Sequence, residues 1–166
     1  LLSGANENPV NGSPGTGSAV VTYDAATHLL SLNVLFSGLE AGTTASHIHC
    51  CVLPDGSAGV ATTVPTFAGF PLGVTSGSYV NTLDLSLASS FNPAFVTAHG
   101  GTVAGAEAAF GTGLEGGMAY LNIHTMSFPA GEVRAFLEPV PEPASAMLAL
   151  TALAGLWLMR RKRARG

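Results

Sequence analysis

The chain has 166 residues, of which only 10% are charged, with 21 glycines and 10 prolines, a composition typical of short strands joined by turns and not of a helical bundle. Residues 1–138 hold nine acidic side chains against the single cation Arg134, a net charge of -8, because the other basic residues all lie at positions 160–165. This body therefore lacks the basic surface that a phosphate backbone requires, and we expect no nucleic-acid partner. It is long enough to bury a hydrophobic core.

Alternation of apolar and polar side chains predicts a series of short strands. The first 18 residues, rich in Gly, Asn, Pro and Ser, are expected to form an edge strand and a loop. Further strands are predicted over residues 18–23, 29–37, 44–51, 60–64, 78–87, 118–125 and 132–138. Helices are predicted over residues 92–98, with Pro93 at the first position, and 103–114. The expected fold is all-β, a Greek-key β-sandwich or barrel with short helical insertions.

Two of these strands carry three of the five histidines. Side chains of a strand alternate between its faces, so the strand at 44–51 presents His47, His49 and Cys51 on one face. The strand at 118–125 presents His124 on the face opposite its apolar side chains. If the two strands are neighbours, the histidines converge. Imidazole is a good ligand for copper and zinc, so this pattern predicts a copper or zinc site.

Other residues could contribute to the predicted metal site, and the histidines also have a second interpretation. His99 could supply an extra ligand, and Glu132 and Arg134, on one face of the last strand, could orient a ligand histidine through hydrogen bonds. The arrangement of two histidines on one strand and a third on another is similar to the copper ligands of copper/zinc superoxide dismutase. The competing interpretation is that the histidines only tie the strands to loop carbonyls, while Arg134 forms an ion pair with Glu132 or another acid.

The C-terminus has a separate organisation. Val140-Pro141-Glu142-Pro143 precedes an uncharged apolar run over residues 144–159 and a basic tail over residues 160–166. As a helix the apolar run would be about 24 Å long, short of a hydrocarbon core of about 30 Å but able to span it if the flanking arginines reach to the surface. The basic end would then lie in the cytoplasm and the acidic body outside.

This tail resembles the PEP-CTERM sorting signal of bacteria that have an exosortase. The resemblance covers residues 139–166, with Pro141, Glu142 and Pro143 as the sorting motif, and separates them from a domain over residues 1–138. It implies export, anchoring in the inner membrane by a transmembrane helix, processing by the exosortase, and transfer to the cell surface or the extracellular space. Exopolysaccharide or matrix proteins are the partners that it suggests.

A protein sorted in this way would meet an oxidising environment, which bears on the only two cysteines, Cys50 and Cys51. They could form a disulfide with each other, which would remove Cys51 as a thiolate ligand. Alternatively, one or both could bind the metal, or they could join two copies of the protein.

A second resemblance covers residues 1–137. It rests on five short motifs in the same order as in the CHRD domain, which is named after chordin: Glu7-Asn8-Pro9-Val10, Ser37-Gly38-Leu39, Ser46-His47-Ile48-His49, Tyr120-Leu121-Asn122-Ile123-His124-Thr125 and Pro129-Ala130-Gly131-Glu132-Val133-Arg134. The resemblance implies a β-rich extracellular fold and no particular activity. The cysteine pair departs from the glycine-rich turn that many CHRD sequences have after the second histidine.

The sequence contains no nucleophile, metalloprotease or phosphate-binding motif that would indicate an enzyme. The function predicted from the sequence is therefore that of an exported, noncatalytic CHRD protein whose histidine face binds copper or zinc. One alternative is a small copper redox enzyme, or one like superoxide dismutase. The other is a structural or adhesive component of the exopolysaccharide matrix that binds no metal.

Overall fold

The computed structural model describes residues 1–140, which form seven strands and four short helices. The strands are β1 (Leu2–Ser3), β2 (Thr16–Asp24), β3 (Leu29–Ser37), β4 (Thr43–His49), β5 (Gly77–Asp84), β6 (Tyr120–Thr125) and β7 (Val133–Phe136). The helices are the 3-10 turns η1 (Gly4–Asn6) and η2 (Ala88–Ser90), and the α-helices α1 (Pro93–Ala98) and α2 (Val103–Glu115). The prediction of a β-rich fold with short helical insertions is confirmed.

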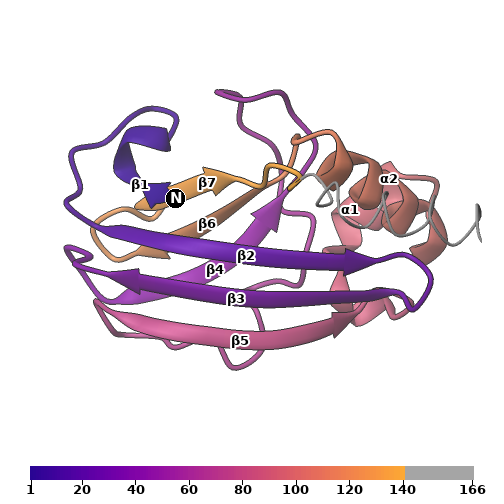
Figure 1. Ribbon diagram of the computed structural model, residues 1–166, viewed down its shortest axis with the longest axis horizontal. Helices are drawn as coiled ribbons and strands as arrows, with labels where there is room; N and C mark the ends of the chain where they lie inside the picture. The colour runs from indigo at the N-terminus through magenta and orange to yellow at the C-terminus, as the bar shows by residue number, and fades with distance from the viewer. Residues whose placement is uncertain (141–166) are drawn as a thin grey trace, which may run out of the picture.

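All seven strands belong to one antiparallel sheet in the order β4-β6-β7-β1-β2-β3-β5. The sheet curls into a half-barrel, so that β2, β3 and β5 lie in front of β4, β6 and β7 in Figure 1. Of the two expected architectures, the sandwich of two separate sheets is not formed, and the single curled sheet is nearer to the barrel. The reason is β1, predicted as an edge strand, which pairs through Leu2 with Gly17 of β2 and through Ser3 with Arg134 of β7. This short strand joins the two halves into one sheet.

The core lies inside the curl of the sheet. β3 follows the predicted alternation, with Leu30, Leu32, Val34 and Phe36 buried, and β6 adds Leu121 and Ile123. The helices close one end of the half-barrel, on the right in Figure 1, where Phe95 of α1 and Phe110 of α2 join the core. Burial of these apolar side chains is the main stabilising contribution to the fold.

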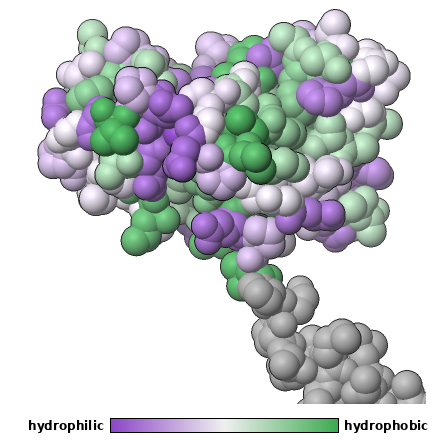
Figure 2. Space-filling view, turned by 90° about the horizontal axis from the view of Figure 1, so that it is seen from above, coloured by the Kyte–Doolittle hydropathy of each residue, from purple (hydrophilic) through white to green (hydrophobic). Residues whose placement is uncertain are grey.

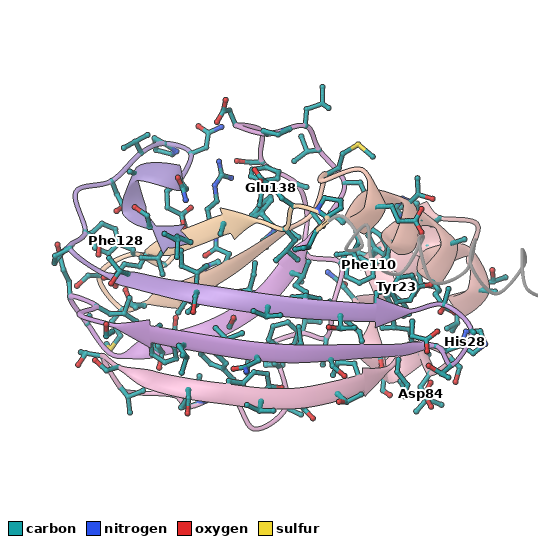
Figure 3. The ribbon with its side chains drawn as sticks, in the orientation of Figure 1. Tyr23, His28, Asp84, Phe110, Phe128 and Glu138 are labelled. Atoms are coloured by element: carbon teal, nitrogen blue, oxygen red, sulfur yellow. A yellow bond between two sulfur atoms is a disulfide. The ribbon has the colours of Figure 1, made fainter. Side chains whose placement is uncertain are left out.

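The helix α2 is attached to the β2–β3 turn by a small polar cluster. Glu107, in the middle of α2, accepts a hydrogen bond from the Tyr23 hydroxyl at 3.1 Å and lies 2.9 Å from Nδ1 of His28. Figure 3 shows Tyr23 and His28 at this end of the sheet, close to the helices. His28, in this turn, is therefore an anchor for α2 and does not belong to the group formed by the histidines of β4 and β6.

The two edge strands of the sheet are β4 and β5. The residues after β4 fold back along its free edge, where the backbone amides of Ala61 and Phe67 donate to the carbonyls of Ile48 and Ser46. The predicted strand at 60–64 is reduced to two isolated bridges within this segment. The returning segment places its carbonyl groups beside the side chains of β4, which matters for the site described below.

Within residues 1–140, no helix has the length and apolar character needed to cross a membrane. The predicted sorting residues Pro141, Glu142 and Pro143, the apolar segment 144–159 and the basic tail 160–166 lie outside the described part of the chain. Figure 2 shows the surface from above, where the most hydrophobic residues lie apart from one another, with hydrophilic and weakly hydrophobic residues between them.

Candidate metal centre

β4 and β6 are neighbours in the sheet, and their pairing brings the three strand histidines together. His47 lies opposite Asn122, His49 opposite Tyr120, and Ala45 opposite His124. Since Leu121 and Ile123 of β6 face the core, the histidines lie on the other face of the sheet. Their ring centroids are 5.9 Å (His47–His49), 5.2 Å (His47–His124) and 6.0 Å (His49–His124) apart. The convergence predicted from the two alternating patterns is confirmed.

Each imidazole donates one hydrogen bond to a backbone carbonyl in a different loop segment. His47 bonds through Nε2 to Pro65 at 2.6 Å, His49 through Nδ1 to Ala58 at 2.9 Å, and His124 through Nδ1 to Pro129 at 3.0 Å. A carbonyl oxygen can only accept, so these contacts fix which nitrogen of each ring carries the proton. The other nitrogen of each neutral ring is then a lone-pair donor.

Those second nitrogens, Nδ1 of His47 and Nε2 of His49 and His124, are buried and have no hydrogen-bond partner within residues 1–140. One nitrogen from each ring lies within 4.8 Å of one from each of the others. An unpaired buried acceptor costs about 1–3 kcal/mol, so three of them in one place are expensive for the fold. Buried polar atoms are normally paired, and a ligand shared by the three nitrogens would account for this arrangement.

Burial also keeps the three rings neutral. It lowers the pKa of His49 to about 4, with smaller contributions from the charges of His124, His47 and Arg134. Burial likewise lowers the pKa values of His47 and His124, partly offset by their bonds to Pro65 and Pro129. A neutral imidazole has a lone pair to give to a metal, so the cluster is ready to bind one at neutral pH.

The spacing of the rings fits a single ion. Three imidazoles around one ion in a plane, with metal–nitrogen distances of about 2.0 Å, have ring centroids about 5.5 Å apart. The separations of 5.2, 5.9 and 6.0 Å surround that value. Small ring rotations would direct the nitrogens to a common point.

Tyr120 and Arg134 support one side of the cluster. The Tyr120 ring stacks on His49 at 4.7 Å, with the planes only 5° apart, and the Arg134 guanidinium lies 4.7 Å above the centre of the same tyrosine. Arg134 donates to the carbonyls of Gly56 and Asn6, and the Tyr120 hydroxyl exchanges hydrogen bonds with Ala58. Arg134 therefore acts on His49 through Tyr120. The sequence analysis did not assign Tyr120 a role, although the alternation of β6 placed it on the face of His124.

Other predicted residues lie elsewhere. Cys50 and Cys51 form a disulfide with each other, so Cys51 offers no thiolate. β4 ends at His49, so the alternation that aligned Cys51 with the histidines stops before it. His99 ends α1, where it bonds to the Phe95 carbonyl and stacks on the Phe95 ring. None of these side chains belongs to the histidine cluster.

Glu132 also has a different place from the one predicted. Its fully buried carboxylate accepts hydrogen bonds from Ser13, the backbone of Glu40 and Thr125, and none from a histidine. The groups that orient the three imidazoles are instead the carbonyls of Pro65, Ala58 and Pro129. No side-chain pattern in the sequence indicates which carbonyls the loops will present.

Comparison with known proteins identifies one matching family. Neither curated proteins nor solved structures include a match to the chain. The model of the CHRD domain family matches residues 1–137, which is most of the sequence and contains all three clustered histidines. The family resemblance of the short motifs is thus confirmed, and the chain belongs to the CHRD domain family.

Proposed function

We propose that this CHRD domain binds one copper or zinc ion between His47, His49 and His124. The observation that carries the proposal is a cluster of three histidines, each with one buried ring nitrogen that has no hydrogen-bond partner among residues 1–140 and each bringing a ring nitrogen within 4.8 Å of the others. Metal-binding histidines usually donate their second nitrogen to a carbonyl or carboxylate, and each of the three rings makes such a bond.

The bonds to loop carbonyls alone would also suit histidines that merely tie strands to loops. That account explains one nitrogen of each ring and leaves the other three buried and unpaired. Metal binding accounts for both nitrogens of all three residues.

The domain is further proposed to be an exported, noncatalytic protein of the cell surface or extracellular space. Extracellular domains are what the family suggests, and the Cys50–Cys51 disulfide suits an oxidising compartment. The PEP-CTERM resemblance of the tail supports anchoring in the inner membrane and processing by an exosortase. Exopolysaccharide or matrix proteins are the proposed partners of the mature form.

The buried position of the nitrogens favours a binding role over the copper redox or dismutase-like alternative, because a catalytic metal needs an open position for substrate. A matrix component without metal is the remaining alternative. It predicts no bound ion under any loading condition.

Metal analysis of the full chain, purified in detergent through a tag without histidine, tests the proposal. After exposure to copper or zinc and removal of free metal, we expect about one ion per chain in the parent and close to none in His49→Ala and His124→Ala. His99→Ala is the matched control, because His99 lies on α1 outside the cluster, and it should retain the ion. Equally low metal in all four proteins would contradict the proposal.

Both alanine variants are expected to fold, since each removes an unpaired buried acceptor along with a bond to a loop. Far-ultraviolet circular dichroism and a thermal unfolding curve of the metal-free forms would check this. If the His49→Ala protein is folded and binds as much metal as the parent, the metal binds outside the cluster.

A further inference from the structure

We infer that the ion held by this cluster is monovalent copper, Cu(I), bound by three imidazoles and no water. The inference rests on the proposed function and narrows it to one oxidation state. It follows from the donor set, the arrangement of the rings, the charge around them and their inaccessibility to solvent.

The donor set consists of three neutral imidazoles. Among the described residues, the metal-binding group contains no carboxylate or thiolate, and the nearby Cys51 is held in a disulfide. Zn²⁺ is almost always four-coordinate, and Cu²⁺ prefers four or more ligands in a tetragonal arrangement. Cu(I), with a filled d shell, is stable with three nitrogen ligands and therefore needs nothing beyond His47, His49 and His124.

The spacing of the three rings is compatible with a planar three-coordinate site. For metal–nitrogen distances of about 2.0 Å, ring centroids are about 5.5 Å apart in a trigonal plane and about 5.2 Å apart at three corners of a tetrahedron. Two of the three separations are 5.9 and 6.0 Å, and only the one between His47 and His124 is as short as 5.2 Å. The observed triangle therefore accommodates a three-coordinate ion after small rotations of the rings.

The charges near the cluster oppose a divalent ion. Arg134 lies behind Tyr120, which stacks on His49, and its positive charge acts on the His49 ring. Glu7 is also buried, and its Oε2 atom lies 3.9 Å from Nε of Arg134. The desolvation free energy of burying an ion grows with the square of its charge, so burying a monovalent ion here costs less than burying a divalent one.

Solvent has little access to the nitrogens that would bind the ion. The unpaired nitrogens of all three rings are buried, and the carbonyls of Pro65, Ala58 and Pro129 bring loops against the rings. A fourth ligand from water would require these loops to move. A closed three-nitrogen site is therefore suited to sequestering copper in its reduced form, without exchange of the ligand shell.

The test is a competition experiment on the metal-free full chain in detergent under nitrogen. Cu(I) is supplied as its acetonitrile complex against the chelator bicinchoninate, and Zn²⁺ is supplied in parallel against a zinc indicator. No thiol reductant is used, since one would open the Cys50–Cys51 disulfide and create thiolates. We expect one Cu(I) per chain, with an affinity at least about 100-fold above that for Zn²⁺.

The double variant Cys50→Ser/Cys51→Ser is the matched control for adventitious thiolates, and it should bind Cu(I) as the parent does. X-ray absorption of the loaded protein should show a Cu(I) edge and three nitrogens at about 2.0 Å. Loss of Cu(I) binding in the double serine variant would overturn the inference. So would a fourth oxygen ligand, or a tetragonal Cu²⁺ paramagnetic resonance signal as the stable form in air.

The two proposals fail in different ways. Tight binding of Zn²⁺ together with weak binding of Cu(I), both dependent on His49 and His124, would overturn the choice of ion and leave the metal site in place. Absence of binding for both ions would overturn the metal site as well. Equal affinities for the two ions would count against the inference, because the charge and coordination arguments both require a difference.

Discussion

The protonation of His49 makes the metal-free domain sensitive to acid. Its pKa is lowered to about 4, from 6.5 in the unfolded chain, so between these values the unfolded state binds more protons and stability falls as the pH falls. The loss from this one residue should reach about 3 kcal/mol. Urea unfolding in the presence of a chelator, at several pH values between 4 and 7, measures it.

The matched variant for this prediction is His49→Gln, whose amide stays neutral throughout that range and can still donate to the Ala58 carbonyl. Relative to the parent, its free energy of unfolding should fall less between pH 6.5 and pH 4. Parallel curves for the two proteins would show that His49 does not remain neutral in the folded state.

Glu7 should have the opposite effect on the pH dependence. Burial raises its pKa to about 7, against the lowering effects of Arg134 and of the hydrogen bond from Asn122. The folded state therefore binds the extra proton, and the stability that it contributes, up to about 3 kcal/mol, is lost as the pH rises from 4.5 through 7. Glu7→Gln resembles the protonated form, so we expect its unfolding free energy to change less than that of the parent between pH 5 and pH 8.

At the residue level, the period of two in a strand was enough to predict that His47, His49 and His124 would meet. It did not predict the groups that hold them, because the Pro65, Ala58 and Pro129 carbonyls come from loops, whose paths no periodicity describes. Of the roles considered for Cys51, the disulfide with Cys50 is present and the metal role was wrong, because β4 ends two residues earlier, at His49.

Among the elements, the packing of α2 against the disulfide gives a prediction. An alanine Cβ at Gly113 would lie 2.6 Å from Cys51 Sγ and nearer still to Cys50 Sγ. Alanine favours a helix by up to about 1 kcal/mol over glycine, but we expect the clash to outweigh this and lower the unfolding free energy by about 1–3 kcal/mol. Urea unfolding of Gly113→Ala measures the change.

Gly59→Ala is the control, because nothing lies within 4 Å of the Cβ that it would add. The cost at Gly113 should shrink when both cysteines are replaced by alanine, since the smaller side chains make room for the new methyl group. An unchanged cost in that background would assign the effect to the helix itself.

Elements with a strong local signal were predicted well. The ends of β3 match the prediction at both residues, and α1 begins at Pro93 as its proline indicated. The predicted position of β1 at an edge of the sheet was wrong. Its two residues carry almost no periodicity, and its place between β2 and β7 depends on partners far away in the chain. For the same reason the sequence did not decide between a sandwich and a barrel, since the joining strand determines whether the two halves are separate sheets.

Across the whole molecule, the buried carboxylate of Glu132 links three distant segments. It accepts from Ser13 in the N-terminal loop, from the amide of Glu40 between β3 and β4, and from Thr125 of β6. Glu132→Ala leaves these donors unpaired, and we expect it to lower the unfolding free energy by about 3 kcal/mol or more. Thermal or urea unfolding measures the loss.

Glu132→Gln separates the effect of hydrogen bonding from that of volume. Its amide oxygen can still accept from Ser13 and Glu40, and its amide group can donate to the Thr125 hydroxyl. It should therefore lose less stability than the alanine variant. A glutamine variant as unstable as the alanine variant would mean that the negative charge itself is what the three segments require.

The position of β1 also determines when the sheet can be completed during synthesis. Because Ser3 pairs with Arg134, β1 can join β7 only after the chain through Arg134 has been made. The half-barrel cannot close before β7 has been made. Pairing between segments so far apart in the sequence is expected to slow folding. Until β7 arrives, β6 and β1 expose unpaired edges, so this domain would depend on chaperones while it is still growing.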